Sequence, residues 1–181
     1  MSVGADSRTV GPRAEEHVVL ALGSNIGDRR GHLQAGIEAL FAEPGLEFAA
    51  ISPVYETDPV GGPDQPNYLN AVLVARTSLP QTVLLERAQG AEAAEQRVRT
   101  EVWGPRTLDV DLIVYGDVVS ADPRLTLPHP RAHERAFVLA PWLDLEPEAE
   151  IPGRGLVSGL LAAVGRSGIR RLDDIELRPP A

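Results

Sequence analysis

The 181-residue sequence contains no cysteine and no lysine, so all 17 of its basic residues are arginine. Without cysteine, the chain has no disulfide framework, thiol nucleophile or thiolate metal site. Without lysine, it has neither a Schiff base nor the lysine of a Walker A phosphate loop. Any phosphate that the protein binds is therefore held by arginine, histidine, backbone amides or a metal ion.

Aromatic residues are scarce, at 4% of the chain, and no apolar run approaches the ~18 residues that a membrane-spanning helix needs. The net charge is −9, from 26 acidic and 17 basic residues. Proteins that bind nucleic acid neutralise backbone phosphates with a basic surface, so the acidic balance argues against that class. We therefore expect neither a nucleic-acid partner nor a membrane partner.

The chain length predicts one domain, since domains typically contain about 100 to 200 residues. Residues 1–16 are polar and lack the apolar centre of a signal peptide. We interpret them as a disordered leader on a cytoplasmic protein, followed by a single domain over residues 17–181.

The hydrophobic pattern predicts a β-α-β-β-α-β order of elements. Asp28 is expected to cap the first helix, and Ser78 with Gln81 has the form of a capping box for the second. The order is that of a ferredoxin-like α+β fold, with two helices on one face of an antiparallel sheet. The predicted strands cover 18–22, 46–55, 68–76 and 108–115, the predicted helices cover 29–42 and about 78–94, and weaker helices cover 131–141 and 156–164.

The most informative pattern is a pair of carboxylates that follows three arginines. On a strand, Asp109 and Asp111 point to the same face, about 6 to 7 Å apart. Such a pair suits Mg²⁺, which bridges carboxylates and substrate phosphates. The alternative is a solvated strand face. Arg97, Arg99 and Arg106 favour the metal site, because guanidinium groups stabilise charge on phosphate oxygens.

A second segment, 124–137, is rich in arginine and histidine. Arg124, His129 and Arg135 are candidate phosphate donors, and the alternative is a surface loop followed by a helix. His129 and His133 have a spacing that metal ligands can use on a helix. The proline after His129 and the lack of a third ligand disfavour that interpretation.

A third segment is the connection at 56–67, which is long for a compact domain and is typical of a mobile lid. Gly61 and Gly62 are candidate hinges for it. Tyr68 and Asn70 share one face of the strand that follows, so an aromatic ring and an amide would line one site. The alternative is that Tyr68 packs beneath its own loop.

These motifs together resemble the 6-hydroxymethyl-7,8-dihydropterin pyrophosphokinase family over roughly residues 18–152. The matching stretches are 22–25, 55–70, 103–111 and 128–129. The resemblance implies a monomeric enzyme with a ferredoxin-like core that acts in tetrahydrofolate biosynthesis. It also implies two Mg²⁺ ions, ATP as co-substrate, and transfer of the β,γ-diphosphate of ATP to the pterin hydroxymethyl oxygen with release of AMP.

The resemblance also implies roles for individual residues. Asp109 and Asp111 correspond to the Mg²⁺ ligands, and Arg97 and Arg106 to arginines that engage the transferring phosphates. Implied ATP contacts are Gln89, Glu92, Arg99, Leu112, Arg124, Thr126, His129 and Arg135. Implied pterin contacts are Thr57, Asp58, Val60, Tyr68, Asn70, Trp103 and Phe137, with the pterin ring stacked between Tyr68 and Phe137.

Two other functions use some of the same features. A nucleotidyltransferase also has a Gly-Ser pair and an Asp-x-Asp pair, but Ser24 lies 85 residues before Asp109, which disfavours that class. A non-enzymatic module that binds RNA or a regulatory metabolite is disfavoured by the charge of −9 and the 4% aromatic content. The segment 23–25 is also a candidate phosphate-binding turn at a helix entry, although a lone Gly-Ser pair is weak evidence for one.

Overall fold

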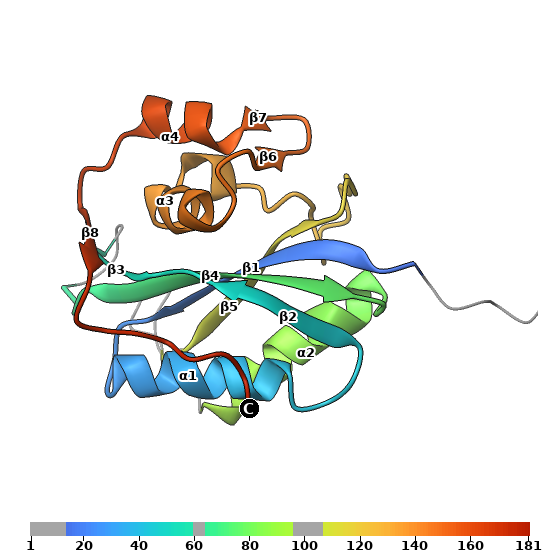
Figure 1. Ribbon diagram of the computed structural model, residues 1–181, viewed down its shortest axis with the longest axis horizontal. Helices are drawn as coiled ribbons and strands as arrows, with labels where there is room; N and C mark the ends of the chain where they lie inside the picture. Colours follow the sequence, from blue (N-terminus) through green and yellow to red (C-terminus); the bar gives the residue numbers. More distant parts are fainter. Residues whose placement is uncertain (1–13, 60–63, 96–106) are drawn as a thin grey trace, which may run out of the picture.

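The computed structural model describes residues 14–59, 64–95 and 107–181 as an antiparallel sheet with helices on both faces (Figure 1). Residues 1–13 of the expected leader lie outside the described residues. So do five of the predicted site residues, namely Val60, Arg97, Arg99, Trp103 and Arg106.

The main sheet has six strands, in the order β5-β1-β4-β3-β8, and β2 also pairs with β4. Every pair is antiparallel, and β1 and β4 lie at the centre. The strands are β1 (Glu16–Ser24), β2 (Leu46–Ile51), β3 (Val54–Thr57), β4 (Tyr68–Thr77), β5 (Asp109–Tyr115) and β8 (Ile169–Leu172), and β6 (Glu150–Ile151) with β7 (Gly155–Leu156) forms a separate hairpin. The predicted α+β class and β-α-β-β-α-β order are confirmed.

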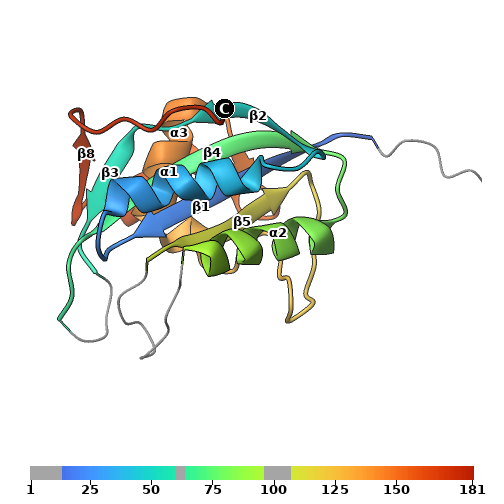
Figure 2. The ribbon, with the colours of Figure 1, turned by 90° about the horizontal axis from the view of Figure 1, so that it is seen from below.

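The helices divide between the two faces of the sheet. α1 (Arg29–Leu40) and α2 (Gln81–Ala94) lie side by side against one face, as predicted (Figure 2). α3 (Ala136–Leu145) and α4 (Val157–Val164) lie over the opposite face (Figure 1). None of the helices in the described ranges is long and apolar enough to cross a membrane.

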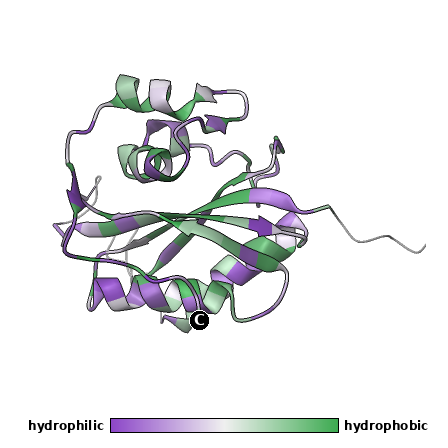
Figure 3. Cartoon of the chain, viewed as in Figure 1, coloured by the Kyte–Doolittle hydropathy of each residue, from purple (hydrophilic) through white to green (hydrophobic). Residues whose placement is uncertain are grey.

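Alternation along the strands produces two separate cores. In β1, Leu20 and Leu22 belong to the core beneath α1 and α2, whereas Val19 belongs to the core beneath α3. The second core includes Trp142, which is 1% exposed. Figure 3 shows hydrophobic colour along the central strands and hydrophilic colour on α1. The central strands are therefore buried on both faces over most of their length.

The predicted single strand over 46–55 is wrong, because the chain breaks at Ser52 and Pro53 into β2 and β3. Proline has no backbone N–H to donate to the sheet. The Ser52 hydroxyl instead accepts a hydrogen bond from the Val72 amide at 2.8 Å and donates one to the Pro53 carbonyl at 2.8 Å. β3 then pairs with β8, a strand that the hydrophobic pattern did not predict.

The two predicted helix caps have different outcomes. The Asp28 cap is confirmed, since its Oδ1 accepts a hydrogen bond from the Gly31 amide at 3.0 Å. The predicted capping box at Ser78 is wrong, because α2 begins only at Gln81 and has no side-chain cap. A residue that precedes proline is disfavoured in the α conformation, so Leu79 before Pro80 stays outside the helix.

The predicted helix over 131–141 is also corrected. A short 3₁₀ helix covers Ala132–Glu134, and α3 then runs from Ala136 to Leu145. Arg135 lies between them in an extended conformation, with φ −109° and ψ 102°. The predicted helix over 156–164 is confirmed as α4.

Candidate active site

The candidate site lies on the face of the sheet that α3 covers, where the inward residues of β1 become smaller. Val19, Ala21 and Gly23 follow one another on this face, so side-chain volume falls towards the end of the strand. Gly23 pairs with Asn70 of β4 on one side and with Asp109 of β5 on the other. The decrease in size at alternate positions was the sequence signal that could have located this close approach of side chains to β1.

Gly23 is required here by close packing. A Cβ atom at this position would lie 2.8 Å from Asn70 Oδ1 and 3.4 Å from the Tyr68 ring. The side chains of Asn70 and Tyr68 therefore extend over the backbone of β1, in space that any larger residue would occupy. This also places Gly23 and Ser24 within a strand rather than in a phosphate-binding turn, and the N-terminus of α1 is instead capped by Asp28.

One side of the site, which we call the carboxylate side, consists of Asp109, Asp111, His129 and Arg135. Asp109 and Asp111 are half-buried, whereas the residues that alternate with them in β5 are buried in the core beneath α2. The two aspartates therefore share the face that was predicted. Their hard oxygen donors suit Mg²⁺, which proteins commonly bind through one or two carboxylates together with water and substrate phosphates.

His129 reaches the carboxylate side because its segment runs beside β5, where its amide donates to the Ile113 carbonyl at 2.8 Å. The ring Nδ1 accepts a hydrogen bond from the Arg131 amide at 3.2 Å, which leaves Nε2 to carry the proton of the neutral ring. Burial lowers the pKa of His129, Asp111 opposes this shift, and Arg135 and Arg131 add to it. The ring is therefore a neutral donor at pH 7.

Arg135 contacts both an aspartate of the carboxylate side and the aromatic ring of Phe137. Its Nη1 lies 4.0 Å from Asp111 Oδ2, and its guanidinium carbon lies 5.5 Å from the centre of the Phe137 ring. Burial lowers the pKa of Arg135 and the Asp111 carboxylate opposes this shift, so the side chain stays charged. The extended backbone between the two helical segments thus places one cation against both an acid and an aromatic ring.

The other side, which we call the amide side, consists of Thr57, Tyr68 and Asn70, to which the sequence prediction adds Phe137. The Asn70 amide nitrogen donates to Thr57 Oγ1 at 2.7 Å, and both residues are buried, at 7% and 3% exposure. Tyr68 lies two residues before Asn70 on the same face, as predicted, and Phe137 lies in the first turn of α3. Asn70 Oδ1 is directed over Gly23, towards the carboxylate side.

Several predicted ATP contacts lie apart from this face. Leu112 is buried in the core beneath α1 and α2, and Gln89 is exposed on α2. Glu92 is buried on α2, and its Oε1 accepts a hydrogen bond from the Val110 amide at 2.9 Å. Glu92 therefore holds β5 at the residue between the two aspartates.

Arg124 and Thr126 lie on the turn that follows β5. The side chain of Arg124 is 88% exposed and lies 3.5 Å from Asp122 Oδ2. The Thr126 hydroxyl donates to the Asp122 carbonyl at 3.1 Å. The structure thus places both residues in the same chain segment as His129, in contact with Asp122 and not with Asp111.

A histidine metal pair gains no support from the geometry. His133 lies in the short 3₁₀ helix, 3.4 Å from a Glu134 carboxylate oxygen, while His129 Nδ1 already accepts a backbone hydrogen bond. Across the described residues, no group of three or more histidine, aspartate or glutamate side chains is arranged to hold a metal ion. A metal at Asp109 and Asp111 would therefore complete its coordination with water and substrate.

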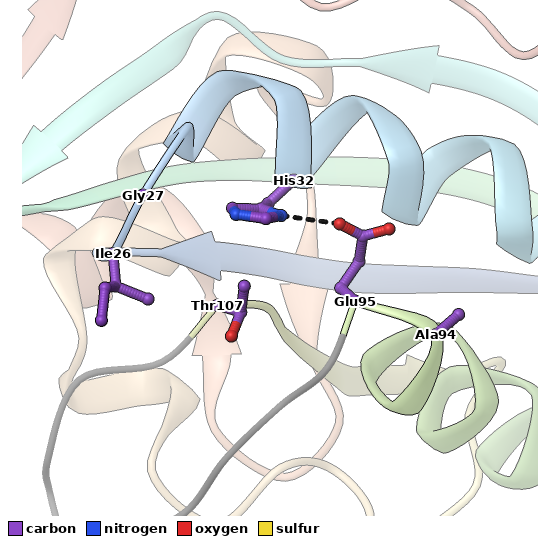
Figure 4. A pocket seen from close by; sticks show the side chains of 6 residues that line it. All are labelled: Ile26, Gly27, His32, Ala94, Glu95 and Thr107. Carbon is purple, nitrogen blue, oxygen red and sulfur yellow. Dashed lines mark hydrogen bonds and ion pairs between the residues drawn. The ribbon is translucent and has the colours of Figure 1, made fainter.

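A separate pocket of about 440 Å³ lies between the ends of α1 and α2 (Figure 4). His32 Nδ1 and Glu95 Oε2 are 2.6 Å apart within it and connect the two helices. The described residues that line it are Ile26, Gly27, His32, Ala94, Glu95 and Thr107, and none of these six is a predicted site residue.

Solved structures support the fold assignment. A Plasmodium falciparum HPPK-DHPS protein crystallised with pteroate superposes with a TM-score of 0.67 at 14% identity. The match covers 90% of this chain and 47% of the Plasmodium chain, so this chain spans about half of that structure. At this identity the likeness concerns the fold alone.

Sequence comparison is more specific. The 2-amino-4-hydroxy-6-hydroxymethyldihydropteridine pyrophosphokinase of Pseudomonas aeruginosa is 41% identical over 157 residues, which cover 87% of this chain and 97% of that protein. The enzyme of the same name from Mycobacterium tuberculosis is 46% identical over 149 residues, covering 76% and 77%. Residues 19–147 match the family 7,8-dihydro-6-hydroxymethylpterin-pyrophosphokinase (HPPK). The chain therefore belongs to the HPPK family.

Proposed function

We propose that this protein transfers the β,γ-diphosphate of ATP to the hydroxymethyl oxygen of 6-hydroxymethyl-7,8-dihydropterin, as a step of folate biosynthesis. The observation that carries the proposal is the placement of Asp109 and Asp111 across Gly23 from the amide of Asn70. A site for metal-bound phosphates and a site for a flat heterocycle thereby adjoin on one sheet face.

The carboxylate side would hold the nucleotide phosphates. Asp109 and Asp111 would bind two Mg²⁺ ions, which when bound neutralise charge on the diphosphate. Arg135 and the Nε2 proton of His129 would donate to phosphate oxygens. The family resemblance adds further candidate nucleotide contacts and phosphate donors, which are Gln89, Glu92, Arg97, Arg99, Arg106, Leu112, Arg124 and Thr126.

The amide side would hold the pterin. Stacking between Tyr68 and Phe137 stabilises a flat aromatic ligand, and Asn70 Oδ1 can accept from a ring N–H at its polar edge. The hydrogen bond from Asn70 to Thr57 fixes that carbonyl before any ligand arrives. Asp58, Val60 and Trp103 are further candidate contacts from the family resemblance.

The reaction then needs alignment more than acid or base chemistry. The hydroxymethyl oxygen forms a bond to the β-phosphorus, and the bond from that phosphorus to the bridging oxygen of the α-phosphate breaks. AMP leaves with the electron pair of that bond, and the alcohol proton passes to solvent. Holding both substrates against one rigid sheet supplies the orientation on which such a transfer depends.

Identification of the nucleotide product tests the proposal. The protein is incubated with ATP, Mg²⁺ and 6-hydroxymethyl-7,8-dihydropterin, and the nucleotides are separated. AMP formed in equal amount with the pterin diphosphate is the expected result. ADP would indicate an ordinary kinase, free pyrophosphate a nucleotidyltransferase, and no turnover a binding module, and each of these would overturn the proposal.

Asp111→Asn tests the metal assignment, because it removes a charge while keeping the size of the side chain. We expect the rate at saturating substrates to fall about 100-fold or more, since metal stabilisation of phosphate charge is worth several kcal/mol. Asp117→Asn, in the exposed turn after β5, is the matched control and should retain the wild-type rate. Equal rates for Asp111→Asn and wild type at saturating Mg²⁺ would refute this role.

A further inference from the structure

The connection between β3 and β4 has two ends that carry candidate pterin contacts. Thr57 and Asp58 lie at the end of β3, and Tyr68 begins β4. Thr57 and Tyr68 pair directly across the two antiparallel strands, so both ends of the connection meet at the amide side. Side chains from three other parts of the chain hold the ends in place.

Arg29, the first residue of α1, contacts both ends with one guanidinium nitrogen. Its Nη1 donates to Glu56 Oε2 at 3.1 Å and to the Asn67 carbonyl at 2.9 Å. Glu56 belongs to β3, and Asn67 immediately precedes β4. Nearby, Asn25 Nδ2 donates to the Pro66 carbonyl at 3.1 Å. Residues at the junction of β1 and α1 thus hold the β4 end at two points.

Arg170 holds the β3 end from the opposite direction. It lies on β8, directly across from Glu56, in the part of the chain beyond the family match at residues 19–147 (Figure 1). Its Nη2 donates to Glu56 Oε1 at 3.0 Å, and its Nη1 lies 3.5 Å from Asp58 Oδ1. The Asp58 amide also donates to the Gly168 carbonyl at 3.0 Å.

Both oxygens of Glu56 are therefore bound by different arginines. Glu56 lies on the face of β3 opposite to Thr57, so both arginines bind it from the face away from Thr57 and Asn70, and Arg170 also reaches the Asp58 carboxylate. Arg29 also places a positive charge at the positive end of the α1 dipole, which disfavours that helix unless the charge is compensated. The pattern fits a clamp that acts through the backbone, and not a substrate contact.

We propose that Arg29 and Arg170 are positioning residues that clamp Glu56 and so hold the paired ends of the β3–β4 connection in the position that the pterin requires. This inference rests on the proposed function for the identity of the ligand. The clamp joins α1, β3 and β8, so the C-terminal strand contributes to substrate affinity without touching substrate.

Arg29→Gln and Arg170→Gln test the clamp, singly and together. We expect each single variant to raise the KM for the dihydropterin about threefold to tenfold, the scale of one or two partly exposed charge pairs. The rate at saturation and the KM for ATP should stay within about twofold of wild type, because the carboxylate side is unchanged. The double variant should show less than the product of the single effects, since both act on Glu56.

Matched controls separate positioning from loss of charge. Arg30→Gln removes the next charge along α1, where the side chain contacts the Glu176 carbonyl, and Arg171→Gln removes the next charge along β8. Both controls should leave the pterin KM within about twofold of wild type. Arg170→Lys keeps a positive charge beside Glu56 and should retain part of the pterin affinity that Arg170→Gln loses. A general loss of folding would not be rescued in this way.

Two readouts do not depend on turnover. Hydrogen exchange in peptides covering 54–59 and 64–70 should quicken about threefold or more in the clamp variants relative to Arg30→Gln and Arg171→Gln. Titration with the dihydropterin should show the same loss of affinity as the KM. If wild type produces AMP and the variants keep both the KM and the exchange rates, the clamp is refuted while the proposed function stands. If wild type neither turns over nor binds the pterin, the proposed function fails, and unchanged exchange rates would then refute the clamp separately.

Discussion

The two sides of the candidate site differ in how completely their polar groups are satisfied by the fold. On the amide side, Thr57 and Asn70 are buried and hydrogen-bonded to each other. On the carboxylate side, the side chain of Asp111 is 43% exposed and its contact with Arg135 is 4.0 Å long. Thr57 and Asn70 are thus satisfied within the fold, whereas the Asp111 carboxylate stays accessible, as the proposed metal site requires.

The difference has a physical cause. A neutral amide that is buried must find its hydrogen bonds within the protein, because an unsatisfied buried donor costs about 1 to 3 kcal/mol. Two carboxylates on one strand face repel each other, and burying them without a cation would cost much more. Asp109 and Asp111 therefore keep access to solvent, and a metal ion would relieve their repulsion.

The largest effect that separates the two sides is expected for Arg135→Gln, because Arg135 contacts both. Loss of a phosphate donor should lower kcat/KM for ATP about 100-fold, as loss of a single preorganised donor does elsewhere. Loss of the cation beside Phe137 should weaken pterin binding only about twofold to fivefold. Steady-state kinetics with each substrate varied in turn measures both effects. If the KM for ATP and the KM for the dihydropterin rose by the same factor, the separate roles of the two sides would be contradicted.

A smaller effect is expected for Gly23→Ala, on the amide side. The added methyl group would lie 2.8 Å from Asn70 Oδ1 and would displace a side chain that is held by Thr57. We expect the pterin KM to rise about tenfold and the protein to lose about 1 to 3 kcal/mol of stability, with little change in the KM for ATP. The KM values and denaturant unfolding measure these changes.

Gly159→Ala is the control for that substitution. Gly159 lies on α4, and an added Cβ there meets nothing within 4 Å. Alanine in a helix should not lower stability and should leave both KM values unchanged. A wild-type pterin KM in Gly23→Ala would show that the close packing over Gly23 does not shape the amide side.

The smallest expected effect is the pH-dependent contribution of Glu56, the residue held by the clamp, to the stability of the protein. A hydrogen bond from Arg170 lowers the pKa of Glu56 below its ordinary value of 4.5, burial opposes this, and Arg29 adds to the lowering. A carboxyl with a lowered folded-state pKa stabilises the protein above its unfolded pKa, and that contribution is lost as the pH falls through the folded pKa.

Thermal unfolding of wild type and Glu56→Gln measures this contribution. At pH 7 the variant should melt about 1 to 3 °C lower, and the difference should disappear as the pH falls below 4.5 and through the lowered pKa of Glu56. Other carboxylates titrate in both proteins, so the comparison isolates Glu56. A difference in melting temperature that is the same at every pH would rule out a contribution from Glu56 ionisation.

Local patterns were sufficient where the structure depends on neighbours in sequence. Alternation along β5 predicted that Asp109 and Asp111 share a face, and a two-residue period decides this in any strand. The Asp28 cap was likewise predictable, because the group that it satisfies is only three residues away. The site residues of β4 were predicted for the same reason.

Other features depended on partners that are distant in sequence. Ser52 ends β2 by bonding to Val72, and Arg135 interrupts a helical pattern beside Asp111. The ion pair of Glu56 with Arg170 spans more than 100 residues. The hydrophobic period carries no information about such pairings. The prediction based on it therefore continued the strand through Ser52 and the helix through Arg135.

The sequence by itself determined the order of elements, the alternation that presents the paired carboxylates, and membership of the HPPK family. It also required that phosphate be held without lysine or cysteine. Only the tertiary structure decided that Gly23 separates the two sides of the site and that arginines from α1 and β8 meet on Glu56. Periodicity is a property of neighbouring residues, whereas the clamp and the close packing over Gly23 arise only when strands distant in sequence pair and bring their side chains together.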